Sequence, residues 1–244
     1  MCETIVRGLT AEGVLPGGLK VSRKASTYLV KAESYTDTLR SRAKLYAYAL
    51  ATAEENASGG TVVTAPTCGS SAVMPAVLYH LVNTRNFSRL RILRALATGG
   101  LFGNVAKTNS SISGAEVGCQ GEVGVACAMA AAAACQLFGG TPSQIEYAAE
   151  MGLEHHLGLT CDPVCGLVQI PCIERNAMAS IKAFNAVMLA KSLESKHKVS
   201  FDQIVEVMYE TGKDLAAGYR ETSTGGLARI YGEAWAAQGK GEQE

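Results

Sequence analysis

Three cysteines stand beside glycine or proline where an irregular segment should turn into a helix. They are Cys119, Cys161 and Cys172. Backbone N–H groups at a helix start point toward such a sulfur and favour the thiolate. The thiolate is the form of cysteine that binds a metal ion or an iron–sulfur cluster. The spacing suits ligands carried by three separate helix ends, so these residues are candidate metal ligands.

The other cysteines near this region have competing interpretations. Cys165 is a rival ligand, because Cys161 and Cys165 lie close enough in the sequence to chelate one ion, although it also suits a small packed position. Cys119, Cys127 and Cys135 follow one another at intervals of eight residues in a predicted helix. Each interval rises by roughly 12 Å, so these three sulfurs cannot share one metal centre. Cys127 and Cys135 are flanked by alanines and are predicted to be buried structural residues.

Two short segments concentrate hydroxyl and amide groups. The first set comes directly before Cys119, and the second begins at Thr67 and Cys68 and continues through small residues to Ser71. Hydroxyl and backbone N–H groups at a helix start bind carboxylates, so both sets are candidate substrate-binding segments. Plain helix capping is the alternative. The members of the first set are Asn109, Ser110, Ser111, Ser113 and Gly114.

Three residues are candidates for proton transfer or for support of the metal ligands. Lys107 precedes the first hydroxyl set, and His155 and His156 end a predicted helix shortly before Cys161. A histidine there can act as a base or hold a metal ligand in place. The alternative is a ring whose hydrogen bonds are satisfied by carbonyls of the last helical turn.

Composition excludes several classes of protein. The formal net charge is zero, whereas nucleic-acid and membrane-surface proteins need a basic excess. The longest apolar run, residues 123–138, is interrupted by Gly124 and Gln136 and is too short to span a membrane. The first residues lack a signal-peptide pattern, which predicts a cytoplasmic protein whose eight cysteines are not a disulfide framework.

The hydrophobic periodicity predicts an all-α, compact multi-helix domain over residues 1–244. Hydrophobic residues make up 48% of the chain and aromatic residues only 6%, which favours close-packed alanine-rich helices. A small-residue helix from about Glu116 to Leu137 is expected at the centre. Residues 1–19 are predicted to be an irregular arm, residues 239–244 a frayed tail, and residues 61–64 have strand composition. Further helices are predicted over residues 20–56 (one or two), 75–82, 90–102, 142–156, 171–193 and 201–217.

Several motifs closely resemble the α domain of the iron–sulfur L-serine dehydratases. The resemblance covers nearly the whole chain. Its motifs are residues 111–124 (Ser-Ile-Ser-Gly-Ala-Glu-Val-Gly-Cys-Gln-Gly-Glu-Val-Gly), 158–164 (Gly-Leu-Thr-Cys-Asp-Pro-Val), 170–177 (Ile-Pro-Cys-Ile-Glu-Arg-Asn-Ala), 62–67, 208–214, 219–223 and 15–21.

The resemblance implies a [4Fe–4S] cluster on Cys119, Cys161 and Cys172, and it removes Cys165 from the ligand set. Three thiolates leave one iron without a protein ligand, and an open site distinguishes a catalytic metal centre. The implied reaction is the dehydration and deamination of L-serine to pyruvate and ammonia, with the open iron acting as a Lewis acid on the hydroxyl. For the first hydroxyl set, the resemblance favours substrate binding over capping.

The resemblance also implies a partner. Family members have a β domain, fused or on a separate chain, with a Ser-Ser-Ser-His type segment that does not occur here. A separate β subunit is therefore expected, in a hetero-oligomer or a higher oligomer. Some fused members end in a cysteine that occupies the open iron, and no cysteine follows Cys172 here. The alternatives are elimination from threonine or cysteine, or a non-catalytic subunit with zinc on Cys119, Cys161, Cys165 and Cys172.

Overall fold

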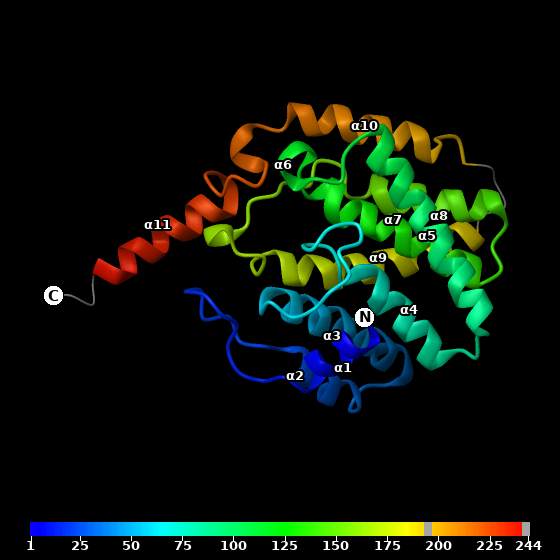
Figure 1. The fold of residues 1–244 in the computed structure, drawn as a ribbon, viewed down its shortest axis with the longest axis horizontal. Coiled ribbons are helices and arrows are strands. Elements are labelled where there is room, and N and C mark those ends of the chain that lie inside the picture. The colour runs from blue at the N-terminus through cyan, green and yellow to red at the C-terminus, as the bar shows by residue number, and fades with distance from the viewer. Residues whose placement is uncertain (193–196, 241–244) are drawn as a thin grey trace.

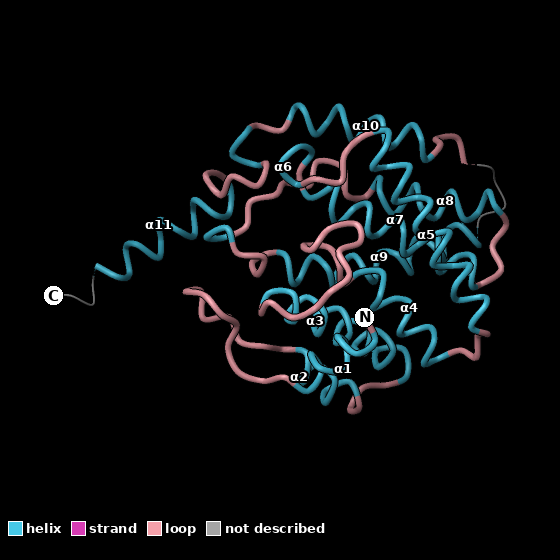
Figure 2. The backbone as a smooth tube through the Cα atoms, in the orientation of Figure 1, coloured by secondary structure: helices cyan, strands magenta, loops and turns pink. Residues whose placement is uncertain are grey.

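The computed structural model describes residues 1–192 and 197–240, which form helices joined by loops (Figures 1 and 2). No strand occurs among these residues, apart from two isolated β-bridges. The all-α prediction is confirmed. The helices are α1 (Cys2–Thr10), α2 (Ala25–Ala32), α3 (Asp37–Ala57), α4 (Val73–Thr84), α5 (Arg89–Asn109), α6 (Gly114–Val117), α7 (Val125–Leu137), α8 (Pro142–Glu154), α9 (Cys172–Ser192), α10 (Phe201–Asp214) and α11 (Gly226–Lys240).

Helix α7 lies at the centre of the molecule and contacts α4, α5, α8 and α9 (Figure 1). Its residues from Val125 to Cys135 are all buried, and most of them are alanines. Small side chains let neighbouring helices approach closely, so a helix of this composition can be surrounded on several sides. The predicted central small-residue helix is therefore confirmed.

The predicted helix from Glu116 to Leu137 is not continuous, however. It is divided into α6, a π-helical turn η1 (Gln120–Gly124) and α7. The division occurs at Gly118, whose φ of 73° is left-handed and ends α6. Cys119 follows as the residue that precedes η1. The break turns the chain just before the predicted metal ligand.

The prediction of an irregular arm over residues 1–19 is wrong for its first half. Cys2–Thr10 form α1, which buries Thr4, Ile5 and Gly8. Gly8 packs against the backbone of Ala51 on α3, a contact that no larger residue would allow. The glycines and the proline that suggested an arm lie in the irregular segment after α1. A contact between distant segments, rather than local composition, stabilises this helix.

The residues with strand composition, 61–64, form part of a loop rather than a strand. No neighbouring strand exists in the described chain to pair with them. The predicted helix starts at residues 142 and 201 are confirmed. Thr141 with Gln144, and Ser200 with Gln203, form complete capping boxes at the starts of α8 and α10.

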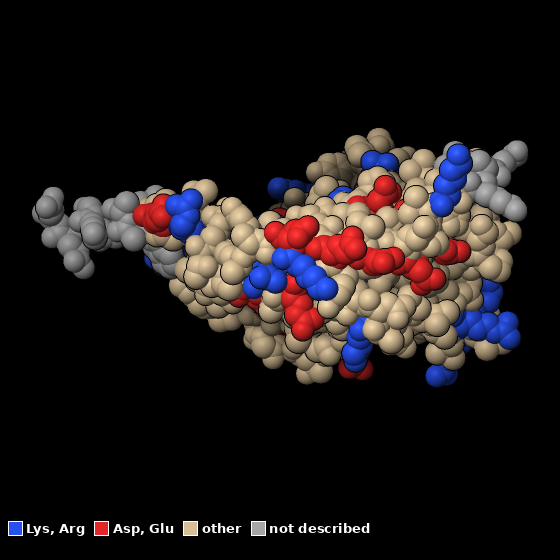
Figure 3. Space-filling model, turned by 90° about the horizontal axis from the view of Figure 1, so that it is seen from above, with Lys and Arg blue, Asp and Glu red and all other residues tan. Residues whose placement is uncertain are grey.

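Helix α10 carries a row of acidic residues on its outer side. Asp202, Glu206, Glu210 and Asp214 recur every four residues and are all exposed. Figure 3 shows acidic side chains following one another across this face of the molecule. The buried face of the same helix contributes Phe201, Ile204, Val205 and Met208 to the core.

Helix α11 extends away from the helical body (Figure 1). The carboxylate of Asp162 accepts a hydrogen bond of 2.6 Å from the N–H of Leu227 and so anchors the helix start. The predicted frayed tail began at residue 239, but residues 239 and 240 are helical, and the remainder of it lies outside the described residues. None of the helices in the described part of the chain has both the length and the apolar character that a membrane span requires.

Candidate metal centre

Cys119 and Glu122 lie on one side of the turn that joins α6 to α7. Cys119 is buried, and its Sγ lies 3.8 Å from Oε2 of Glu122. The same carboxylate oxygen lies 3.5 Å from Sγ of Cys161. Ligand atoms of these three residues all lie within 4.8 Å of one another. The sequence prediction did not include Glu122, although its position three residues after Cys119 places both side chains on one helical face.

The other two predicted ligands come from separate segments. Cys172 is the first residue of α9, as predicted for a helix start, and it is buried. Cys161 is buried too, but it does not lie at a helix start, so that expectation is wrong. Its backbone pairs with residues 219–221 in a β-bridge, where its N–H donates to the carbonyl of Tyr219 at 2.8 Å. A pairing with a segment so distant in the sequence fixes the position of this thiol.

The charges around the thiols decide which of them loses its proton first. A hydrogen bond from Cys161 lowers the pKa of Cys119, Arg175 lowers it further, and burial and Glu122 oppose both. The same hydrogen bond raises the pKa of Cys161, as do burial and the negative charges nearby. Burial first, and then the charges of Cys119 and Glu122, raise the pKa of Cys172 to about 12. All three thiols therefore face one electrostatic environment, in which Cys119 is the easiest to ionise.

The donor set fits an iron–sulfur cluster. Two buried thiols, those of Cys119 and Cys161, meet at Glu122, and thiolates are the ligands that hold such clusters. The buried Cys172 lines the same small gap as Gly69, whose Cβ would lie 3.4 Å from Oε1 of Glu122. Gly114 leaves the required space, because a Cβ at this position would lie 2.6 Å from Oε2 of Glu122 and 2.9 Å from Sγ of Cys161. Arg175 donates to the carbonyl of Thr160 at 2.6 Å and supplies positive charge beside the site. Cys165, the rival ligand, is exposed.

The predicted hydroxyl sets both reach this region. Gly114 adjoins Cys161, and a Cβ on Gly121 would lie 3.0 Å from the carbonyl oxygen of Ser111. The Ser111 hydroxyl is occupied locally, since it accepts a hydrogen bond of 3.1 Å from the N–H of Ser113. Oγ of Ser110 is buried and has no partner among the described residues. From the second set, Thr67 donates to Oε1 of Glu122 at 2.8 Å.

The remaining members of these sets are more exposed. Cys68 is exposed and lines a small gap that Cys172 also lines. Asn109 ends α5 and is exposed, and Lys107 lies exposed in the last turn of that helix. Neither has a side-chain contact with the thiols among the described interactions. Their assignment to the site therefore stays a prediction.

The two histidines at the end of α8 bind the carbonyls of their own helix. Nδ1 of His155 lies 2.9 Å from the carbonyl oxygen of Met151, and Nδ1 of His156 lies 2.7 Å from that of Gly152. This is the arrangement of the capping alternative. His155 is exposed and His156 is buried. A catalytic role for either histidine stays a prediction.

Burial first, and then the positive charge of Lys182, lowers the pKa of His156 to about 4, against its usual 6.5. In the unfolded state, the His156 ring therefore binds a proton near pH 6.5. In the folded state, the ring binds this proton only near pH 4. We expect the free energy of unfolding of the metal-free protein to fall by about 2 kcal/mol from this ring between about pH 7 and pH 5. Urea unfolding of His156→Gln should show a smaller pH dependence than the unchanged protein. His155→Gln is the control and should keep the pH dependence of the unchanged protein. If His156→Gln kept it as well, the assignment to His156 would be contradicted.

Cys127 and Cys135 lie away from the thiol set, on α7. Burial raises the pKa of Cys127 to about 12 and that of Cys135 to about 11, so both remain protonated. We expect Cys127→Ala to lower the free energy of unfolding by about 1–2 kcal/mol, as for other small core changes, and to leave metal binding unchanged. Metal analysis of the folded variant checks this. A folded Cys127→Ala protein that had lost its metal would show that the cysteines were assigned wrongly.

The fold and the site define an all-α protein in which buried thiols and one half-buried carboxylate lie at the junction of several helices. Residues 1–228 match the family model described as serine dehydratase alpha chain. The chain belongs to this family. Relatives include L-serine dehydratase 1 of Escherichia coli, 54% identical over 233 residues, and the L-serine dehydratase of Streptomyces coelicolor, 52% identical over 230 residues.

These relatives are longer than the chain. The matches cover 93% of this chain but 51% of the Escherichia coli protein and 50% of the Streptomyces coelicolor protein. The L-serine dehydratase of Helicobacter pylori is 50% identical over 224 residues, which is 89% of this chain and 49% of that protein. The chain thus spans about half the length of the curated relatives it matches.

Proposed function

We propose that the chain is the α subunit of a [4Fe–4S]-dependent L-serine ammonia-lyase that forms pyruvate and ammonia. The approach of the buried Cys119 and Cys161 at one carboxylate carries this proposal, and Cys172, buried at the start of α9, is the third predicted ligand. These three residues would hold the cluster. When bound, the cluster supplies a Lewis acid for the substrate hydroxyl at the iron that has no cysteine ligand. The names of the relatives support L-serine as the substrate.

The chain's own residues would hold the substrate zwitterion beside the thiols. The unpartnered hydroxyl of Ser110 would donate to the carboxylate, and Gly114 keeps a side chain out of the space beside Glu122 and Cys161. Asn109, Ser111, Ser113, Thr67 and Cys68 complete the proposed binding surface. A residue must also remove the α-proton. Lys107, His155 and His156 are the candidates within the chain. Nδ1 of each ring lies at a helix carbonyl, and no hydrogen bond joins either ring to the thiols among the described residues, so we propose that the partner supplies the base.

A second candidate function is a non-catalytic subunit that binds a single metal ion such as zinc. The close spacing of Cys119, Glu122 and Cys161 favours it, because their ligand atoms lie within 4.8 Å of one another. Anaerobic purification separates the two candidates. The lyase requires a brown protein with about four iron and four sulfide per chain. A colourless protein with one zinc ion per chain would contradict it. Turnover assays with threonine and cysteine test the alternative substrates.

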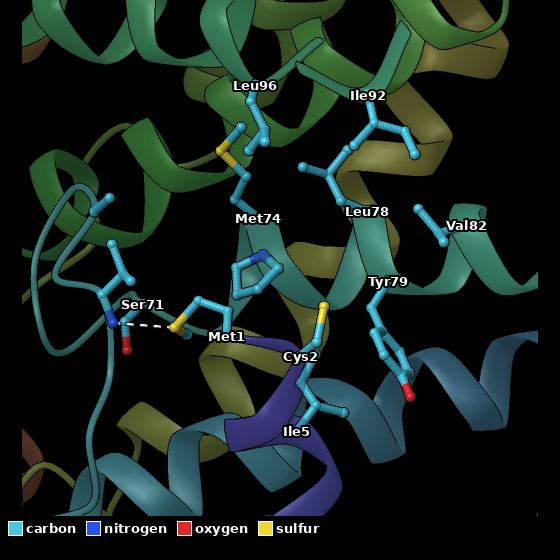
Figure 4. Close-up of a pocket in the computed structure, with 13 residues that line it drawn as sticks. Met1, Cys2, Ile5, Ser71, Met74, Leu78, Tyr79, Val82, Ile92 and Leu96 are labelled. Carbon is cyan, nitrogen blue, oxygen red and sulfur yellow. Dashed lines mark hydrogen bonds between the residues drawn. The ribbon is translucent and has the colours of Figure 1, made fainter. Parts of the chain in front are cut away.

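We propose that a separate β subunit supplies the part of the relatives' length that this chain lacks. An apolar groove of about 380 Å³ offers a docking surface where α1, α4 and α5 meet (Figure 4). Met1, Ile5, Leu78 and Leu96 project toward it, and Val82 and Leu96 are 44% and 42% exposed. Exposed apolar surface of this kind marks contact sites between proteins.

We propose that the protein is located in the reducing cytoplasm, where free cysteines persist.

We expect Leu96→Asp to weaken binding of the β chain by about tenfold or more, because a charge would then lie in the groove. Isothermal titration of the two purified chains measures this, and the cluster content should not change. Leu101→Asp is the matched control, since Leu101 is an exposed leucine of α5 that does not line the groove. If Leu96→Asp and Leu101→Asp bound the β chain with equal affinity, the docking surface would lie outside the groove.

A further inference from the structure

Glu122 is a half-buried carboxylate beside two buried thiols, and it has no ion-pair partner in the part of the chain that the structure describes. In the metal-free protein, three groups supply its hydrogen bonds. The thiols of Cys119 and Cys161 donate to Oε2 at 3.8 and 3.5 Å, and the hydroxyl of Thr67 donates to Oε1 at 2.8 Å. The carboxylate therefore depends on donors that are themselves the predicted metal ligands.

Metal binding changes this balance. A bound metal replaces the protons of both cysteines, so Glu122 loses two donors and faces two anionic sulfurs at short distance. A carboxylate enclosed by anionic sulfurs is stabilised by pairing with a cation or by coordinating a metal. Since no basic side chain reaches Glu122 in the described structure, the metal itself is the cation available to it.

The carboxylate is also held in position for such a bond. The hydroxyl of Thr67 engages Oε1 and leaves Oε2 directed at the two sulfurs. A Cβ on Gly69 would lie 3.4 Å from Oε1, and one on Gly114 would lie 2.6 Å from Oε2, so two glycines shape the space around the group. Glu122 lies in the π-helical turn Gln120–Gly124, and such turns frequently occur at functional sites.

We propose that Glu122 is a further protein ligand of the metal centre and binds iron through Oε2 at the position to which no cysteine is assigned. This inference rests on the proposed function, because it assumes that Cys119, Cys161 and Cys172 bind a four-iron cluster. A carboxylate is a weaker ligand than a thiolate for such an iron, so it protects that position in the resting protein and remains exchangeable.

The test compares Glu122→Gln, Glu122→Asp and the unchanged protein after anaerobic reconstitution with iron and sulfide. Glu206→Gln is the matched control, because Glu206 is an exposed carboxylate on α10. Circular dichroism establishes that each variant is folded. The readouts are iron and sulfide per chain, the Mössbauer spectrum without substrate, and the rate at which one iron is lost to a chelator, followed by the paramagnetic signal of the three-iron form.

We expect Glu122→Gln to assemble the cluster, to lose the exchangeable iron roughly 10–100-fold faster, and to alter the spectrum of that iron alone. The rate of iron loss from Glu122→Asp should lie between those of Glu122→Gln and the unchanged protein, since aspartate retains a carboxylate. Identical rates and spectra in Glu122→Gln and the unchanged protein would overturn the inference and leave the proposed function intact. If the unchanged protein holds no iron–sulfur cluster, the proposed function fails and the inference fails with it. If it binds a single ion instead, an unchanged affinity in Glu122→Gln likewise overturns a ligand role.

Discussion

Serine in place of Cys161 is expected to remove the iron–sulfur cluster and nearly all dehydration of L-serine by the complex of both chains. The serine hydroxyl has the size of the thiol but does not ionise to a comparable ligand for iron. Cys161 is fixed by the pairing of its backbone with residues 219–221, so a neighbouring side chain cannot take its place. We expect a loss of at least about 1,000-fold in turnover, which corresponds to about 4 kcal/mol.

Cys127→Ser is the control for this substitution. It makes the same chemical change in another buried cysteine, whose Sγ lies 3.4 Å from the carbonyl oxygen of Ala179 rather than at the site. Iron and sulfide analysis should show a full cluster in Cys127→Ser and none in Cys161→Ser. A folded Cys161→Ser protein that retained its iron and its turnover would show that Cys161 is not a ligand.

The second large effect concerns the partner. We expect the reconstituted chain alone to turn over L-serine at less than about 1% of the rate of the complex with a β chain, because a positioned base contributes about 10²–10⁴-fold. No hydrogen bond joins His155 or His156 to the thiols among the described residues, and the apolar groove at α1, α4 and α5 is uncovered. Pyruvate formation measured under anaerobic conditions, with and without the β chain, checks this expectation.

Turnover by the chain alone of about 10 s⁻¹, the rate of a typical enzyme, would place the base within these residues. His155→Gln and His156→Gln would then separate the two histidines, and Lys107→Met would test the third candidate. The β chain should restore turnover to the unchanged protein but not to Leu96→Asp. This result would show that activity depends on binding of the β chain at the groove.

Much of the fold is predictable because its signals are local. The two capping boxes start α8 and α10 where the sequence indicates, since the side chain and the N–H groups that it binds lie three residues apart. The alanine-rich α7 is predictable from composition, because such a helix is stable only when neighbours surround it closely. The first helix is different. The glycines and the proline that follow it suggested an irregular arm, whereas the close approach of Gly8 to Ala51, which stabilises α1, joins distant segments.

The site divides in the same way. The motifs predict the three cysteines as ligands, and this assignment stays a prediction. The backbone of Cys161 is positioned by Tyr219, a contact between distant segments that leaves no periodic signal. Glu122 has a sequence signal, its spacing from Cys119, but many helices carry a glutamate at that distance. The contacts of its carboxylate with Cys161 and Thr67, which are distant in the sequence, distinguish Glu122 from other helical glutamates.

The most direct measurement is the Mössbauer spectrum of the complex of both chains, reconstituted with iron-57, before and after anaerobic addition of L-serine. If an iron without a cysteine ligand binds the substrate, the spectrum of about one quarter of the iron will change, which is the share of one site in a four-iron cluster. The same change should be absent when D-lactate, which lacks the amino group and the β-hydroxyl, replaces L-serine. A spectrum that L-serine leaves unaltered, in a preparation that forms pyruvate, would contradict a substrate-binding iron held by Cys119, Cys161 and Cys172.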